Sequence, residues 1–546
     1  MVVDLRTNVR RTTPFTWEKT RWDTAIIVLL VGCLFLFARN VVRFSVPPFE
    51  DAAMLMRYAQ HVAEGHGVVW NIGEPPVDGA TDFLFMIVTA FLVRIGLSVE
   101  SAVRSLGAVT HLLTVILVYL AVRYLHRGPI LVALTSALYL AIGPGLYYVA
   151  AYFGTPFFAF FASLTWCLAW LVVKHPDSVL LALLFSLSGL ATGLVRPEGV
   201  ILAALMLLAI VFLLGWRQSS KAIVAFLLVF SILGGLFFAW RWSYFGHPLP
   251  TPFVKKGAGL LYPNSLRESL RNTLILCLPF VPMVILGLRS RPSSRLTVFW
   301  LIPIIGFATV FVLLSNDMNF GARFQYAVLP ILLISWYAAI PGVEKDFRLP
   351  AWASLPTRPR VTLLLLAAVL LVGALGYAYL TSRTTTYGRD GRYDVGRMLG
   401  SYADDDLTMA TSEAGLLPLY SRWRAVDTWG LNDSWIATRG EITDNNLDRY
   451  KPHLIVFHTW FSPPIAPQGS SQWDNMTILL KEYAERHNYI LAAAFGSNPY
   501  DVHYYYVRPD FPESAEIVDR LQSMDYYYYS TGTKATDYAR VEETPG

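Results

Sequence analysis

The chain has 546 residues, of which 54% are hydrophobic and 15% are charged, with a mean hydropathy of +0.44. An ordinary soluble domain carries about 25% charged residues, so this composition excludes a single soluble globule, and 14% aromatic residues exclude intrinsic disorder. The charge is unevenly divided. Residues 1–382 hold 29 Lys and Arg against 16 Asp and Glu, whereas residues 383–546 hold 15 against 23. The sequence therefore predicts two domains, an apolar basic body (1–382) and a polar acidic domain (383–546).

The body contains eleven apolar runs that suit transmembrane helices, each of which needs about 20 residues. A twelfth segment, 83–97, is short and contains Arg94. If this segment does not cross, 17 Lys and Arg residues fall in alternate loops, which favours a cytoplasmic N-terminus and places residues 383–546 outside. The predicted spans are 24–38, 106–122, 130–154, 155–173, 178–195, 199–216, 222–240, 272–288, 296–316, 324–343 and 361–382.

The first outer loop, 41–105, is the richest in chemical groups. An amphipathic pattern after Pro47 and Pro48 predicts a helix from about residue 50 to Gly65, suited to a membrane interface. Glu50 and Asp51 lie at its start. They are open to two interpretations: carboxylates that deprotonate a hydroxyl or hold a metal, or acidic residues that satisfy a helix N-terminus.

The later outer loops add charged residues that topology alone does not explain. Arg196-Pro-Glu198 is either a turn or an anion site. Lys255 and Lys256 lie on the outward face against the positive-inside rule, which favours a phosphate contact over a solvated surface. Asp317-Met-Asn-Phe-Gly-Ala-Arg323 reads as a turn, with an arginine at the membrane edge.

The acidic domain, about 160 residues long, is expected to have an α/β fold. Apolar runs at 407–411, 454–458 and 490–495 predict strands, and 473–487 reads as a helix. No G-x-x-x-x-G-K-[ST] phosphate loop occurs, and nothing supports nucleic-acid binding, because the basic residues mark topology.

Two classes of function fit a membrane body with these loops. A transporter places ionisable residues or broken helices at the midplane, whereas here the polar residues gather at one face, beside a soluble domain. That arrangement favours an enzyme acting at the outer surface on a lipid-borne substrate with a phosphate group. A flippase for lipid-linked sugars is the alternative from another class.

The first outer loop also resembles a known family. The stretch EDAAMLMRYAQHVAEGHGVVWNIGEPPVDGATDFL, beginning at Glu50, resembles the first outer loop of the GT-C membrane glycosyltransferases that include the mycobacterial terminal β-(1→2) arabinofuranosyltransferase. Shorter similarities follow in the chain. They are R196-P-E-G, Y244-F-G-H-P-L-P with Lys256, D317-M-N-F-G-A-R-F, A414-G-L-L-P-L-Y-S and D427-T-W-G-L-N-D.

The resemblance implies a GT-C fold of about 11 transmembrane helices with an extracytoplasmic C-terminal domain in a bacterial plasma membrane. It implies transfer of a sugar, arabinofuranose or a hexose such as mannose, from a polyprenyl-phosphate donor to a glycan, glycolipid or protein hydroxyl. It makes Glu50 and Asp51 the catalytic pair. Asp51 is the first choice as base, because Glu50 replaces the usual aspartate and its longer side chain displaces the reactive oxygen.

The remaining site residues follow from the loops and the resemblance together. A divalent cation is left open. The expected donor or phosphate contacts are Arg57, His66, Arg196, Lys255, Lys256 and Arg323, and the expected acceptor or loop-ordering residues are Asp78, Glu198 and Asp317.

Overall fold

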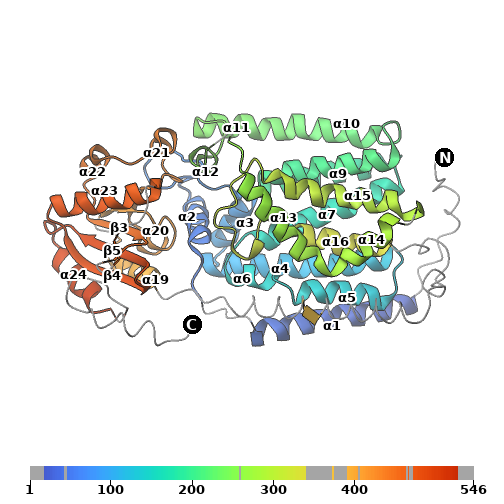
Figure 1. The fold of residues 1–546 in the computed structure, drawn as a ribbon, viewed down its shortest axis with the longest axis horizontal. Helices are drawn as coiled ribbons and strands as arrows, with labels where there is room; N and C mark the ends of the chain where they lie inside the picture. Colours follow the sequence, from blue (N-terminus) through green and yellow to red (C-terminus); the bar gives the residue numbers. More distant parts are fainter. Residues whose placement is uncertain are drawn as a thin grey trace.

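An elongated bundle of apolar helices forms the larger part of the chain and an α/β domain forms the smaller part (Figure 1). The computed structural model describes residues 17–41, 46–257, 260–289, 291–339, 372–373, 390–403, 406–462, 465–466, 471–524 and 526. The bundle helices are α1 (Trp17–Val41), α4 (Val99–Leu120), α5 (Ile130–Ala141), α6 (Gly145–Ala150), α7 (Thr155–Lys174), α8 (Val179–Val195), α9 (Glu198–Leu214), α10 (Ser220–Val229), α11 (Gly235–Phe245), α13 (Pro263–Cys277), α14 (Val281–Arg289), α15 (Arg291–Val310) and α16 (Val328–Ser335).

Local capping sets the ends of several of these helices. The side chain of Ser98 accepts a hydrogen bond from Ser101 N (3.2 Å) at the start of α4, and Ser178 caps α8 in the same way. Gly215 and Gly246, with φ of 82° and 75°, end α9 and α11, because residues with a Cβ rarely adopt these angles.

The bundle identifies the chain as a multi-pass membrane protein. Among the described residues, six helical segments are long and apolar enough to cross a bilayer. Five shorter apolar helices of 10–17 residues accompany them. The predicted span 361–382 lies almost wholly outside the described residues, so the number of eleven crossings stays a prediction.

Three short helices lie at the end of the bundle that faces the α/β domain: α2 (Glu50–Glu64), α3 (Phe83–Arg94) and α12 (Thr251–Lys255) (Figure 1). With 12 residues, α3 is about 18 Å long, well short of the ~30 Å core of a bilayer. The predicted amphipathic helix is α2, and Gly65 ends it with φ of 92°. Only part of its polar side reaches water: Glu64 is exposed, whereas Arg57 and His61 are buried beneath the α/β domain.

The α/β domain is built on a five-stranded sheet with the order β2-β1-β3-β5-β4. Strand β1 pairs in parallel with β2 and β3, while β5 pairs antiparallel with β3 and β4. The strands at 407–411, 454–458 and 490–495 and the helix at 473–487 are found, and β2 and β5 are additional. The elements are α19 (Arg392–Leu399), β1 (Thr408–Thr411), α20 (Leu416–Ser421), β2 (Arg424–Asp427), α21 (Ser434–Arg439), α22 (Asp444–Tyr450), β3 (Leu454–Thr459), α23 (Gln472–Arg486), β4 (Ile490–Asn498), β5 (Asp501–Val507) and α24 (Ser514–Gln522).

Alternation along the strands divides the domain into two apolar cores. On one face, Tyr504 and Tyr506 of β5 pack in a core with residues of α21, α22 and α23. On the other face, Tyr505 and Val507 join α19, α20 and α24 in a core that continues through α2 into the membrane bundle. The soluble domain is therefore fastened to the bundle by continuous apolar packing.

Polar side chains of α2 and the following loop complete this attachment. The Asn71 amide pairs with the free side of edge strand β2, accepting from Ala425 N (2.9 Å) and donating to Ala425 O (3.0 Å). Trp70 Nε1 also donates to Ala425 O, at 2.8 Å. Asn71 thus occupies backbone groups that an exposed edge strand would otherwise offer to another chain.

Candidate active site

The loops predicted to lie outside meet at the end of the bundle that carries the α/β domain. Ion pairs join them over long sequence distances: Asp51 with Arg323, Asp82 with Arg196, and Asp78 with Arg241. Charged groups from four separate loops therefore share one region.

A cavity of about 380 Å³ lies in this region. Its wall is mostly apolar, with charged groups from α2, from the loops and from the residue after α12. Leu431 of the α/β domain also lines it, so both halves of the chain enclose the space. The lining charged residues are Asp51, Asp82, Arg196, Glu198, Lys256 and Arg323.

Asp51 is the carboxylate of the predicted pair that reaches the cavity. Its side chain is 36% exposed and accepts a hydrogen bond from Arg323. The Arg323 guanidinium lies 4.0 Å from the Phe153 ring centroid and 4.9 Å from that of Phe324. Aromatic contacts of this kind hold the cation in place. Within the described residues, buried Nε of Arg323 has no hydrogen-bond partner, which leaves a donor for a ligand.

Arg196 and Glu198 form a second charged group at the cavity wall. Arg196 Nε donates to Glu198 Oε1 at 2.5 Å, and its Nη1 lies 3.5 Å from Asp82 Oδ1. Burial alone would lower the pKa of Arg196, but the two carboxylates outweigh it and raise that pKa. Burial raises the pKa of Asp82, and the Arg196 charge opposes this.

The two adjacent lysines have different surroundings. Lys256 lines the cavity, and in the described part of the chain no carboxylate or carbonyl pairs with its ammonium group. Lys255 instead donates to the Gly440 carbonyl, and its ammonium lies 4.3 Å from the Trp429 ring centroid. Burial lowers the pKa of Lys255. Lys256 is thus placed to meet a bound anion, and Lys255 contacts the α/β domain.

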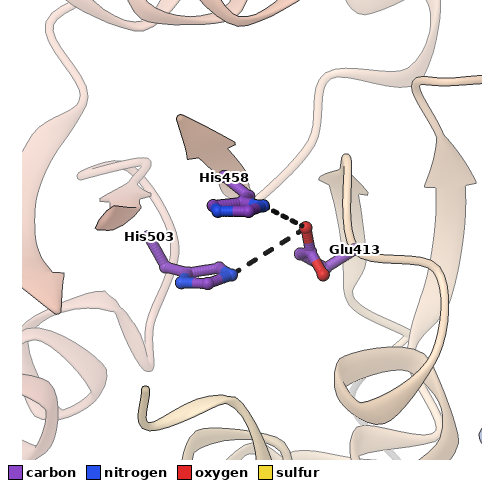
Figure 2. A group of neighbouring side chains, drawn as sticks. All are labelled: Glu413, His458 and His503. Atoms are coloured by element: carbon purple, nitrogen blue, oxygen red, sulfur yellow. Dashed lines mark ion pairs between the residues drawn. The ribbon is translucent and has the colours of Figure 1, made fainter. Parts of the chain in front are cut away.

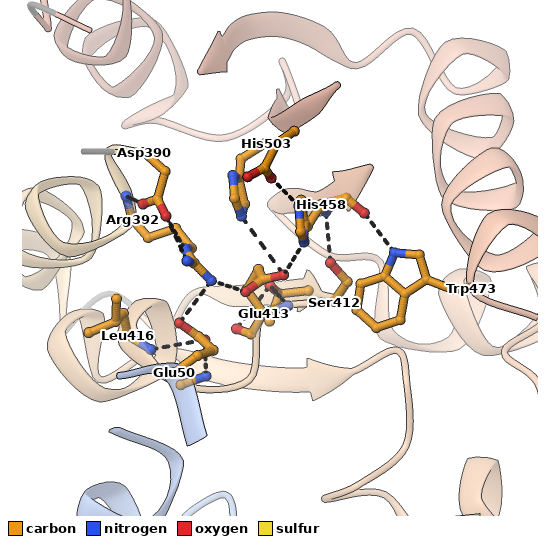
Figure 3. Close-up of polar contacts among 12 residues, drawn as sticks. Glu50, Asp390, Arg392, Ser412, Glu413, Leu416, His458, Trp473 and His503 are labelled. Carbon is orange, nitrogen blue, oxygen red and sulfur yellow. Dashed lines mark hydrogen bonds and ion pairs between the residues drawn. The ribbon is translucent and has the colours of Figure 1, made fainter. Parts of the chain in front are cut away.

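Glu50 does not line the cavity but contacts the α/β domain (Figure 3). It accepts hydrogen bonds from Gly415 N, from Leu416 N (3.1 Å) and from Arg392 (3.2 Å). Burial, aided by the nearby Glu413 carboxylate and opposed by Arg392, raises the pKa of Glu50 to about 8. The two members of the predicted catalytic pair therefore point to different places.

Arg57 and His66 do not line the cavity either. Arg57 is 3% exposed, and its guanidinium donates to Trp70 O, Trp423 O, Pro418 O and Asn71 Oδ1. These hydrogen bonds use the N–H groups of a guanidinium for which the sequence predicts a contact with the sugar donor or its phosphate. His66 is exposed, with Nε2 at 3.9 Å from the Glu64 carboxylate.

Asp78 and Asp317 complete the predicted set. Asp78 is buried, pairs with Arg241 at 2.7 Å, and its backbone carbonyl accepts from Thr251 N at 3.0 Å. These contacts tie the first outer loop to α11 and α12. Asp317 is exposed and pairs with Ser315, which itself lines the cavity.

Asp82 and Arg392 are the main residues that sequence reasoning passed over. Asp82 directly precedes the apolar run of α3. Carboxylates are common at helix starts, so this position alone does not mark Asp82 as a site residue. Arg392 is the basic partner of Glu50, yet the two are 342 positions apart in the sequence. Local patterns carry no signal for such a pair.

Comparisons with known proteins agree with this architecture. Crystal structures of ArnT from Cupriavidus metallidurans, apo and bound to undecaprenyl phosphate, are 16% identical to this chain, with a TM-score of 0.55 over 89% of this chain and 98% of theirs. The Archaeoglobus fulgidus oligosaccharyltransferase tethered to an acceptor peptide is 12% identical, with a TM-score of 0.50 over 91% of this chain and 75% of that protein.

Both neighbours are GT-C glycosyltransferases, so the chain has the GT-C fold, as the first-loop motif predicts. The sequence profile named Domain of unknown function (DUF8728) matches residues 378–509. The match begins just before the acidic domain and covers most of it. No curated protein matches the sequence.

Proposed function

We propose that this chain is an integral membrane glycosyltransferase that takes a sugar from a polyprenyl-phosphate donor and passes it to a hydroxyl group on the outer face of a bacterial plasma membrane. The observation that carries the proposal is the cavity in which an accessible carboxylate, Asp51, lies beside Arg323 and in which Lys256 is unpaired among the described residues. We take residues 1–382 as the membrane domain and 383–546 as the extracytoplasmic domain.

These groups suit displacement at an anomeric carbon. Asp51 accepts the proton of the acceptor hydroxyl while the acceptor oxygen bonds to the anomeric carbon. The bond from that carbon to the phosphate oxygen breaks, and its electron pair leaves with the polyprenyl phosphate. Lys256 and Arg323 stabilise the charge that grows on this phosphate. As Asp51 becomes protonated, Arg323 loses its anionic partner and turns its charge to the leaving group.

The apolar part of the lining supports a lipid donor. Leu249, Phe311 and Leu313 line the cavity close to the charged groups, a mixture that suits an isoprenoid chain ending in a phosphate. ArnT, which shares the fold, has been crystallised with undecaprenyl phosphate. For this chain, a lipid-linked donor is therefore the natural first test.

The sugar and the acceptor are proposed from the first outer loop and from the position of the α/β domain. Arabinofuranose is favoured by the resemblance of the first outer loop alone, and mannose or another hexose is the alternative within the same fold. The α/β domain borders the cavity through Leu431, so we place the glycan, glycolipid or protein acceptor on that side. Asp82 and Asp51 offer oxygen ligands should the reaction use a divalent cation.

The deciding experiment uses the purified full chain in nanodiscs. Prenyl-phosphate arabinofuranose and prenyl-phosphate mannose are offered separately with envelope glycan acceptors, and the glycosylated product is measured by mass spectrometry. We expect transfer from one donor and none with Asp51→Asn, which preserves size but removes the base. Movement of the lipid across vesicles without transfer would support the flippase instead, and full activity of Asp51→Asn would remove Asp51 from the mechanism.

A further inference from the structure

A cluster of two histidines and a glutamate lies in the α/β domain (Figure 2), and none of the three residues lines the cavity. His458 of β3 and His503 of β5 are directly opposite each other in the antiparallel register, so both side chains lie on the same face of the sheet. Glu413 follows the end of the neighbouring strand β1 and reaches the same place. Three adjacent strands thus deliver three metal-ligating side chains to one point.

The distances within the cluster fit a single small cation. Glu413 Oε1 lies 3.4 Å from His458 Nδ1 and 3.8 Å from His503 Nε2, and one ligand atom from each residue falls within 4.8 Å of the others. Tetrahedral zinc with bonds of about 2.0–2.1 Å holds its ligand atoms about 3.4 Å apart. The imidazole rings are stacked with centroids 4.4 Å apart and planes at 9°, so metal binding requires a rotation about χ2 that turns the two ring nitrogens toward one ion.

His503 supplies an independent sign of a missing ligand. Its side chain is 2% exposed, and neither ring nitrogen makes a hydrogen bond within the described residues. A buried imidazole without a hydrogen bond is costly, because it loses the water that would solvate it. A metal ion on Nε2 satisfies one of these nitrogens.

The surrounding residues hold the ligands as outer-shell residues do in metal sites (Figure 3). Asp501 pairs with His458 Nε2, which leaves His458 Nδ1 directed at Glu413. Arg392 pairs with Glu413 Oε2 and leaves Oε1 to the histidines. The His458 side chain is 21% exposed and that of Asp501 45%, which gives an ion a path from solvent.

We propose that Glu413, His458 and His503 bind a divalent transition-metal ion, with Zn²⁺ as the best fit to two imidazoles and one carboxylate. Three protein ligands leave a fourth position for water. Arg392 contacts both Glu413 and Glu50. Through Glu413 and Arg392, the ion therefore stabilises the part of the α/β domain that contacts the start of α2. The site is separate from glycosyl transfer, and its test needs no substrate.

The test measures metal binding by the full chain in detergent micelles. After chelation and removal of the chelator, Zn²⁺ is added in equilibrium dialysis and bound metal is counted by mass spectrometry. We expect one ion per chain in wild type and at least a tenfold loss of affinity in His503→Gln. The matched control is His487→Gln, which changes a histidine of the same domain that contacts Tyr483 and Asp448, and it should bind like wild type.

One further measurement tests the proposal independently of the variants. X-ray absorption of the zinc-loaded wild type should show two imidazoles in the first coordination shell, and this measurement stands even if His503→Gln fails to fold. No stoichiometric binding, equal binding by His503→Gln, or fewer than two imidazoles would overturn the proposal. In that case a proton on His458, paired with Glu413 and Asp501, is what holds the cluster together.

Discussion

Replacing Lys256 by alanine is the sharpest test of the phosphate site. Of the three cations that line the cavity, Arg196 and Arg323 already have carboxylate partners. Lys256 has no such partner among the described residues, so its removal leaves no carboxylate unpaired. Any effect of the substitution therefore reports on the bound anion.

The size of the effect follows from the exposure of this side chain. A hydrogen bond to a charged group contributes about 1.5–3 kcal/mol, and the half-buried position of Lys256 places it near the lower value, because solvent screens the charge. About 1.5 kcal/mol corresponds to about a tenfold rise in KM for the donor. The leaving phosphate gains charge during transfer, so kcat should fall as well.

Initial rates of polyprenyl-phosphate release, measured by chromatography across donor concentrations, give both constants. Lys221→Ala is the control for loss of a lysine, because Lys221 lies at the other end of the bundle and pairs with Asp177 at 3.6 Å. Lys255→Ala should lower Tm through the contact with Gly440 and raise KM less than Lys256→Ala does. Unchanged KM and kcat in Lys256→Ala would refute the phosphate role.

Three other predictions concern the attachment of α2. Glu50 keeps its proton in the folded state up to a pKa of about 8, above the ordinary value of 4.5. Its contribution to stability is therefore full below pH 4.5 and is lost as the pH rises through 8, by at most ~1.4 kcal/mol per pH unit. Glu50→Gln should flatten this slope in thermal unfolding. Arg57→Met leaves buried carbonyls unsatisfied and should cost about 3 kcal/mol, seen as faster proteolysis between the two domains. Gly415→Ala places a Cβ against the backbone carbonyl of Glu50 and should reduce transfer, whereas Gly235→Ala, with open space around it, should not.

Each of these has a clear contrary result. An unchanged pH slope in Glu50→Gln would mean that another group carries the proton. Arg57→Met that is as protease-resistant as wild type would show that the carbonyls find other donors. Equal activity of Gly415→Ala and wild type would show that the start of α2 can shift without affecting Asp51.

The membrane architecture was predictable because it depends on local composition. Apolar runs and the distribution of Lys and Arg follow from the bilayer itself, and the predicted outer loops do meet at one end. Strands β1, β3 and β4 are apolar runs and were also readable. Strand β2, with the sequence RAVD, has a charged residue at each end, and β5 is rich in tyrosine, so neither shows a plain apolar run.

The site was predictable in part. Asp51, Arg196, Glu198, Lys256 and Arg323 were named from the loops, and the structure brings them to one cavity. The sequence grouped Glu50 with Asp51 because they are neighbours in the chain. On a helix, consecutive side chains diverge by about 100°, so one faces the cavity and the other the α/β domain. That division depends on residues more than 340 positions away.

The pairing of Asn71 with the edge of β2 affects whether the soluble domain can be exchanged between related chains. The profile matching 378–509 suggests an exchangeable module, yet the amide that closes its edge strand belongs to Asn71, 354 residues before Ala425. A chimera that imported the soluble domain alone would expose Ala425 and leave the carbonyls of Pro418 and Trp423 without their Arg57 donor. We therefore expect a stable chimera to carry residues 50–74 together with the α/β domain that they contact, although the two segments are far apart in the sequence.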